Sequence, residues 1–291
     1  MAVQGSVHIG KNVELVYIDQ LASCSVYIDS LLKSDNEENR KYFFAKARGF
    51  FKKAEPVLLY NGSKYDALLN SIDRPNAKDN EIAKIRNEKS LEFDWLWQNL
   101  SEALRYDSAL TKNCIGLKNR LMVAMDGLHV ERMDEHHLLL MLQYALVGPI
   151  LSDLDQSDSS AILAVRARYE AASVYLGLQE YLEVFKESFK NPDLFRAWMI
   201  EISVSVSLLS KNDDIVFDRN VFIKQHIIPQ MELIKATATD WEVPWLDSIQ
   251  FRNNSTLVKS KIAFDANIFR NVLSEEVTKA QPFLKRTAPE H

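Results

Sequence analysis

The chain has 291 residues, of which 47% are hydrophobic and 26% are charged, and this length can bury one large core or two smaller ones. Its eight Gly and eight Pro are few, so the composition favours long helices over strands and turns. The formal net charge of −5 argues against general nucleic-acid binding, because such binding draws its affinity from a basic surface.

Targeting and cysteine content point to the cytoplasm. Residues 1–20 lack the basic and apolar regions of a secretory signal. The longest apolar run, residues 138–150, is shorter than the roughly 20 residues that span a bilayer, so we expect no membrane contact. Cys24 and Cys114 are the only cysteines, too few for a disulfide framework or a thiolate metal site.

Helical spacing of apolar residues runs through the first half of the chain. The expected helices cover residues 12–33, 37–54, 64–72, 81–110 and 112–128. Cys24 keeps the apolar spacing of the first helix, which predicts a buried hydrophobic side chain rather than a nucleophile. Pro56 is expected to end the second helix, and the polar residues 73–80 are expected to form an exposed loop.

Apolar residues also keep helical spacing through the second half of the chain. One expected helix ends at residues 148–149, and others cover 159–185, 219–236 and 262–279. A further segment starts at residues 191–193 and keeps helical spacing from Phe195 to Leu209. In 159–185, a stripe is expected to face the core, with Val174 widening it so that more than one side is covered: Ile162, Val165, Tyr169, Ala172 and Leu176. Residues 202–208 alternate like a strand, but the longer window favours a helix.

These segments predict an all-α body of nine to twelve mostly antiparallel helices. The acidic, serine-rich residues 152–160 are the expected boundary between an N-terminal lobe, residues 1–155, and a C-terminal lobe, residues 156–291. A single domain with two layers of helices fits the sequence as well.

Arg166 and Glu170 are four residues apart and so share one face of the expected helix 159–185. Apolar residues flank them, which predicts a semi-buried ion pair that fixes the packing of this helix. We expect the two side chains to contact each other, with at least one shielded from water. A role in a functional site is the alternative.

Basic and aromatic residues alternate in the segment 40–53. If the cations line an exposed stripe, they form the best nucleic-acid-binding surface of the chain: Lys46, Arg48, Lys52 and Lys53. The alternative is an ordinary amphipathic helix with solvated charges. In both cases Phe43 and Phe50 are expected to be buried, because they share a face with alanines.

Arginine followed by histidine at short spacing suggests one catalytic possibility. HEPN-type helical ribonucleases use an Arg to hold the scissile phosphate and a His as acid or base, with four to six residues between them on one helix. Arg219 and His226 are the preferred catalytic pair here, and Arg132 with His137 and Arg286 with His291 also fit. The spacing alone does not establish a family resemblance.

Two carboxylate–histidine pairs have the spacing of metal ligands on a helix: Asp126 with His129, and Asp134 with His137. Both occur in one short stretch, whereas di-iron bundles draw ligands from several helices. Acidic residues at a helix start explain the second pair without a metal. Because phosphate-binding loops and zinc-finger spacings are also missing, we expect neither a metal nor a cofactor.

The sequence favours a non-enzymatic interaction or assembly protein. Abundant helix and spare aromatic residues, such as Trp95, Trp241 and Trp245, suit a protein that binds other proteins or itself. A metal-independent ribonuclease acting on RNA is the alternative, and a local basic patch would serve it.

Overall fold

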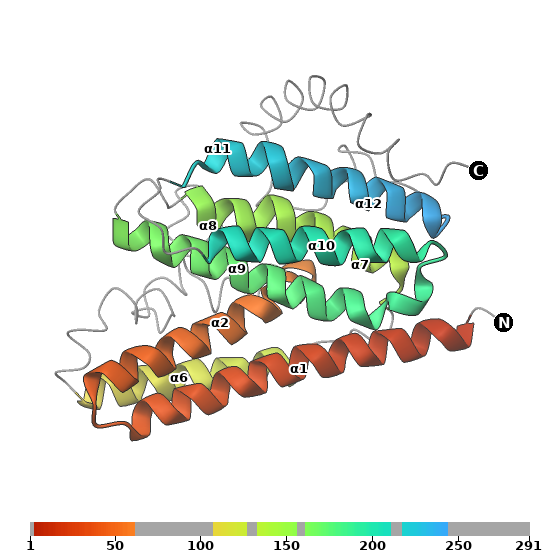
Figure 1. Cartoon of the computed structure of the whole chain (residues 1–291). Helices are drawn as coiled ribbons and strands as arrows, with labels where there is room; N and C mark the ends of the chain where they lie inside the picture. The colour runs from red at the N-terminus through yellow and green to blue at the C-terminus, as the bar shows by residue number, and fades with distance from the viewer. Residues whose placement is uncertain (1–2, 62–106, 127–132, 156–160, 211–216, 244–291) are drawn as a thin grey trace, which may run out of the picture.

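A computed structural model describes residues 3–61, 107–126, 133–155, 161–210 and 217–243 (Figure 1). Within these ranges every regular element is helical, which confirms the all-α prediction. α1 (Val3–Lys33), α2 (Glu37–Asn61) and α6 (Asp107–Asp126) lie together on one side. α9 (Ala161–Val184), α10 (Pro192–Leu209) and α12 (Ile228–Asp240) lie on the other, and α2 contacts both groups.

Two of the helical runs contain a π-helical turn. α7 (Glu135–Ala145) continues through η1 (Leu146–Ile150) into α8 (Leu151–Asp155). α11 (Arg219–Phe222) likewise continues through η4 (Ile223–Ile227) into α12, and a 3₁₀ turn, η3 (Lys186–Ser188), connects α9 to α10. Such turns often lie at functional sites, and η4 contains His226.

Two expected helix breaks are wrong. Pro56 lies inside α2, which continues to Asn61, and α6 runs without interruption over residues 110–112. A proline inside a helix removes one backbone hydrogen bond. Here Val57 and Leu58, in the following turn, are fully buried, and their burial offsets that loss.

α10 contains residues 202–208, so the prediction of a helix despite their alternation is confirmed. The side chain of Asn191 caps the helix by accepting the N–H of Asp193, and Pro192 occupies the first turn. Trp198, Ile202, Ser205 and Leu209 are buried at helical spacing. The long period therefore describes this segment better than the local alternation.

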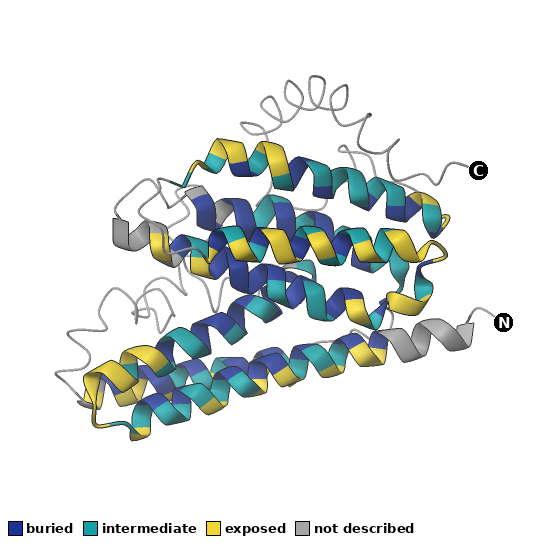
Figure 2. Cartoon of the chain, viewed as in Figure 1, coloured by how far each residue is buried: buried dark blue, intermediate teal, exposed yellow. Residues whose placement is uncertain are grey.

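α9 is the central helix, and Figure 2 shows how much of it is buried. Residues 170–175 are all buried, which confirms cover on more than one side. The expected core-facing stripe is wrong in part, since Val165 and Tyr169 are 50% and 42% exposed. The main buried face lies about two residues further along, at Ala171, Val174, Tyr175, Leu178 and Leu182.

Glycine allows α2 and α9 to cross closely. A Cβ added to Gly177 of α9 would lie 2.2 Å from the backbone oxygen of Lys53 in α2. A Cβ at Gly49 of α2 would lie 2.7 Å from the hydroxyl oxygen of Tyr169. The lack of a side chain at these positions sets how near the two helices approach.

Residues of both expected lobes contribute to one hydrophobic core, so the division at residue 155 remains a prediction. Cys24 and Cys114 are buried free thiols, as expected for Cys24. None of the described helices combines the length and apolarity needed to cross a bilayer. The expected helices 64–72 and 262–279, the loop 73–80 and most of the expected helix 81–110 lie outside the described residues.

Candidate functional site

A buried ion cluster joins α2 to α9. The Arg48 guanidinium donates from Nε to Oε1 of Glu170 at 3.1 Å and from Nη2 to Oε2 at 3.0 Å. Both side chains are almost completely shielded from water. Parallel hydrogen bonds of this kind are the strongest that arginine makes with a carboxylate. The pair therefore fixes both the distance and the orientation of the two helices.

Lys52 extends the cluster to α8. Its Nζ donates to Oδ1 and Oδ2 of Asp153 at 2.8 and 3.0 Å. The same ammonium lies 3.0 Å from Oε2 of Glu55 and 3.4 Å from Oε2 of Glu170. Burial opposes the charge of Lys52, but the Asp153, Glu55 and Glu170 carboxylates outweigh it and raise the pKa above its ordinary value.

The cluster contains more acids than bases. Arg48 and Lys52 bring two positive charges, whereas Glu55, Asp153 and Glu170 would bring three negative ones. A net charge is costly in a dry interior. Burial raises the pKa of Asp153 to about 8. The carboxylates of Glu170 and Glu55 also raise this pKa, whereas the positive charge of Lys52 lowers it. The raised pKa of Asp153 favours its protonated form, which offsets part of the negative charge of the three carboxylates.

The expected exposed stripe of cations on α2 is wrong for Arg48 and Lys52, which are 3% and 2% exposed. The physical reason is that α2 lies between neighbouring helices and buries a broad face. Phe44 and Phe51 are fully buried, instead of the expected Phe43 and Phe50. The expected pair is half-buried and packs against Tyr27, with ring centroids 6.5 and 5.5 Å away.

Lys46 and Lys53 are the partly exposed members of the predicted nucleic-acid-binding set. The Nζ of Lys46 lies 5.6 Å from the centre of the Tyr42 ring. Lys53 donates to Oε1 of Glu180 at 2.6 Å. Helix α2 thus carries all four predicted cations, but it spreads them over different faces.

The expected contact between Arg166 and Glu170 stays a prediction, because the Arg166 side chain lies outside the described residues. Glu170 is buried, as expected of at least one of the pair. Arg48 and Lys52 are partners that the sequence analysis missed. Helical spacing reveals only neighbours on the same helix, and these cations lie on α2.

The predicted catalytic residues lie on one continuous helical run. Arg219 begins α11, and His226 is in η4, seven residues later. At 1.5 Å per residue this places them about 10 Å apart along the axis. Nδ1 of His226 lies 3.6 Å from Oε2 of Glu201 on α10, which sequence reasoning missed. Among the described residues neither atom has a hydrogen-bond partner.

Asp134 and His137 form a helix cap. Oδ1 of Asp134 accepts the backbone N–H of His137 at 3.1 Å, and the imidazole lies against the same carboxylate. Burial raises the pKa of Asp134, but the His137 backbone and side chain outweigh this effect and lower it. No group of three or more His, Cys, Asp or Glu in the described part of the chain could hold a metal.

Other predicted residues have simpler outcomes. Trp241 is nearly buried and packs against Phe185 and Phe189, with ring centroids 6.1 and 4.9 Å away. It belongs to the core and not to a contact surface. The remaining candidates lie outside the described residues: His129, Arg132, Arg286, His291, Trp95 and Trp245.

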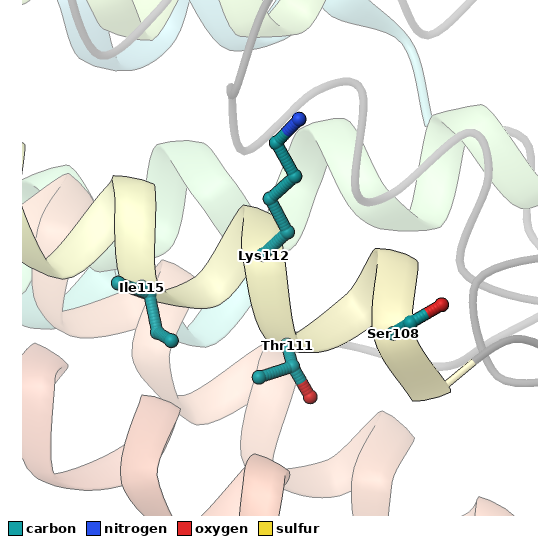
Figure 3. Close-up of a pocket in the computed structure, with 4 residues that line it drawn as sticks. All are labelled: Ser108, Thr111, Lys112 and Ile115. Carbon is teal, nitrogen blue, oxygen red and sulfur yellow. The ribbon is translucent and has the colours of Figure 1, made fainter.

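An open depression of about 540 Å³ lies along the first half of α6 (Figure 3). Among the described residues, Ser108, Thr111, Lys112 and Ile115 of α6 line it. These four carry no set of groups for acid–base or metal chemistry.

Comparison with known proteins gives no relative. The sequence matches no protein-family model, no curated protein and no solved structure.

Proposed function

We propose that this protein is a helical assembly protein that binds other protein chains, including copies of itself, without catalysing a reaction. The observation that carries the proposal is the outer face of α6. Ile115, Met122 and Val123 are 51%, 54% and 53% exposed on it. The opposite face of the same helix contributes Leu110, Cys114, Leu117 and Leu121 to the core. Apolar side chains gathered on an outer face mark a protein contact.

The buried ion cluster supports a structural role for the charged residues of α2. Arg48 and Lys52 are paired with carboxylates in the interior, where they hold α2, α8 and α9 together. Groups engaged in this way stabilise the scaffold that presents the outer faces. The two cysteines are free and buried, and unpaired thiols suit the cytoplasm as the proposed compartment.

Light scattering of the purified full chain tests this proposal. An assembly protein is expected to have an apparent mass above that of one chain, rising with protein concentration. A mass equal to one chain over the whole concentration range contradicts self-assembly. Copurifying chains of other sequence, identified by mass spectrometry, would then be the remaining support for an assembly role.

A second candidate is cleavage of RNA, and the contact between His226 and Glu201 favours it. A carboxylate beside Nδ1 can orient an imidazole, which is what an acid–base catalyst needs. Arg219, two turns away, would hold a phosphate. Incubating labelled RNA with the purified protein and a chelator distinguishes the ribonuclease from the assembly protein.

For the ribonuclease, the expected result is degradation by the parent and by a His136→Ala control, and a loss of at least about 100-fold in His226→Ala. His136 is a suitable control because it lies on α7, away from this pair. Intact RNA with all three proteins rejects the ribonuclease and leaves the assembly proposal standing.

A further inference from the structure

The outer face of α6 has the spacing of a coiled-coil seam. Exposed positions recur on it at alternating steps of four and three residues, as Ser108, Lys112, Ile115, Asn119, Met122 and Asp126 do, and the exposed Thr111 and Val123 lie beside them. A seam with this 3.5-residue period stays aligned with a partner helix along its whole length. From Lys112 to Asp126 it extends about 21 Å.

The seam is complementary to a reversed copy of itself about its centre, Asn119. Four residues before Asn119 is Ile115, and three and four residues after it are Met122 and Val123. Seven residues before the centre is a cation, Lys112, and seven residues after it is an anion, Asp126. In an antiparallel pair about this centre, Ile115 therefore meets Val123 of the second copy and Lys112 meets Asp126, while Met122 lies over Gly116.

We propose that two copies of this chain pair through α6, antiparallel, with a two-fold axis passing beside Asn119. This proposal rests on the proposed assembly function and names the partner. Such an interface is isologous, since the same surface is used by both copies. The Asn119 side chain suits the axis because its amide carries both a donor and an acceptor, which can pair with its own copy.

Charge also selects the direction of pairing. A parallel pair in the same register would place Lys112 against Lys112 and Asp126 against Asp126, and like charges that meet at an interface are unfavourable. In the antiparallel pair these repulsions become two attractions. The open depression beside Lys112 and Ile115 then lies opposite Val123 and Asp126 of the second copy, and it can receive the Val123 side chain (Figure 3).

The first test reverses the charges of Lys112 and Asp126 and measures the dissociation constant of the dimer by sedimentation. Lys112→Glu and Asp126→Lys are each expected to weaken the dimer by about tenfold, because each creates two repulsions in a symmetric pair. The double variant K112E/D126K is expected to have a dissociation constant within about threefold of that of the parent. In this variant Glu and Lys attract each other again, with the two charges exchanged. Ile200→Glu, at a 56% exposed position on α10, is the matched control and is expected to change nothing.

Disulfide trapping is the second test and reports geometry directly. Lys112→Cys alone and Asp126→Cys alone are expected not to cross-link, whereas an equal mixture of the two is expected to give disulfide-linked dimers under mild oxidation. The natural thiols of Cys24 and Cys114 are buried and do not compete. Cross-linking of each variant with itself indicates the parallel arrangement and overturns the proposal.

The results separate this inference from the assembly function. A parent that forms oligomers while the charge variants and the cysteine mixture behave like the control rejects pairing through α6 and keeps assembly through another surface. A parent that is monomeric at every concentration rejects self-assembly and with it pairing through α6, and binding to chains of other sequence is then the remaining form of the assembly function. Circular dichroism of each variant checks that the fold is retained, which is expected because every substituted position is exposed.

Discussion

The guanidinium of Arg48 donates two hydrogen bonds to the carboxylate of Glu170, although the two residues are 122 positions apart in the chain. The pair lies in the interior, where α2 and α9 cross. Lys52, one turn further along α2, pairs with Asp153 and so brings α8 to the same place. These buried ion pairs thus connect α2, α8 and α9.

Glu170→Gln should destabilise the fold by about 3–5 kcal/mol, because the buried guanidinium of Arg48 loses the carboxylate that accepts its two hydrogen bonds. Glu180→Gln is the control: Glu180 also pairs with a lysine of α2, Lys53, but its side chain is 40% exposed. Its loss should cost less than about 1 kcal/mol. Urea unfolding of both variants measures the difference, and equal losses would contradict the structural importance of the buried cluster.

Gly177→Ala should destabilise by about 3 kcal/mol, because the new Cβ would meet the backbone of Lys53 and the helices would have to separate. Gly49→Ala is the matched substitution on α2. There the nearest atom is the hydroxyl of Tyr169, a partly exposed side chain that can move, so stability should stay within about 1 kcal/mol of the parent. Thermal melts compare the two. A mild effect at Gly177 would contradict the close crossing.

The raised pKa of Asp153 predicts that the stability of the fold depends on pH. Burial raises the pKa of Asp153 to about 8, above its unfolded value of about 3.9, so the folded chain binds a proton that the unfolded chain releases. This stabilisation is complete below pH 4 and is lost as the pH rises through 8. The slope reaches at most about 1.4 kcal/mol per pH unit.

Asp153→Asn removes the titrating group and isolates this effect. The stability of the parent minus that of the variant should decrease between pH 5 and pH 8. Denaturant unfolding at four or five pH values measures both proteins. A difference that stays constant over this range would show that the cluster takes up no proton on folding.

The cap of α7 gives a smaller prediction. Asp134→Ala should cost about 1 kcal/mol, because it removes the acceptor for the His137 N–H. Asp134→Ser keeps an acceptor and should recover most of that loss. Since the pKa of Asp134 is lowered in the fold, its contribution should disappear as the pH falls below 4. Equal stability of the alanine and serine variants would contradict the capping role.

The fold class could be predicted because it depends on periodicity, which is local. The helix at 202–208 and the buried position of Cys24 followed from spacing over windows longer than a few residues. The choice of the buried face of α2 did not follow from spacing. Neighbouring phenylalanines, Phe43 with Phe44 and Phe50 with Phe51, give two nearly equal stripes, and only the packing of α2 against other helices decides between them.

The partners of charged residues could not be predicted for a related reason. Helical spacing tests contacts three or four positions away, whereas Glu170 pairs with a residue of another helix. Glu201 lies 25 positions before His226 and carries no local signal of their contact. The sequence analysis did not identify the outer face of α6, because its exposure could be known only once the other side of α6 had been placed in the core.

Sedimentation equilibrium of the purified full chain, over a hundred-fold range of protein concentration, tests the central claim most directly. The assembly account predicts that the weight-average mass rises with concentration and approaches twice the mass of one chain. The K112E variant should shift this rise to higher concentration, and K112E/D126K should shift it back. A mass equal to that of one chain at every concentration would contradict self-assembly.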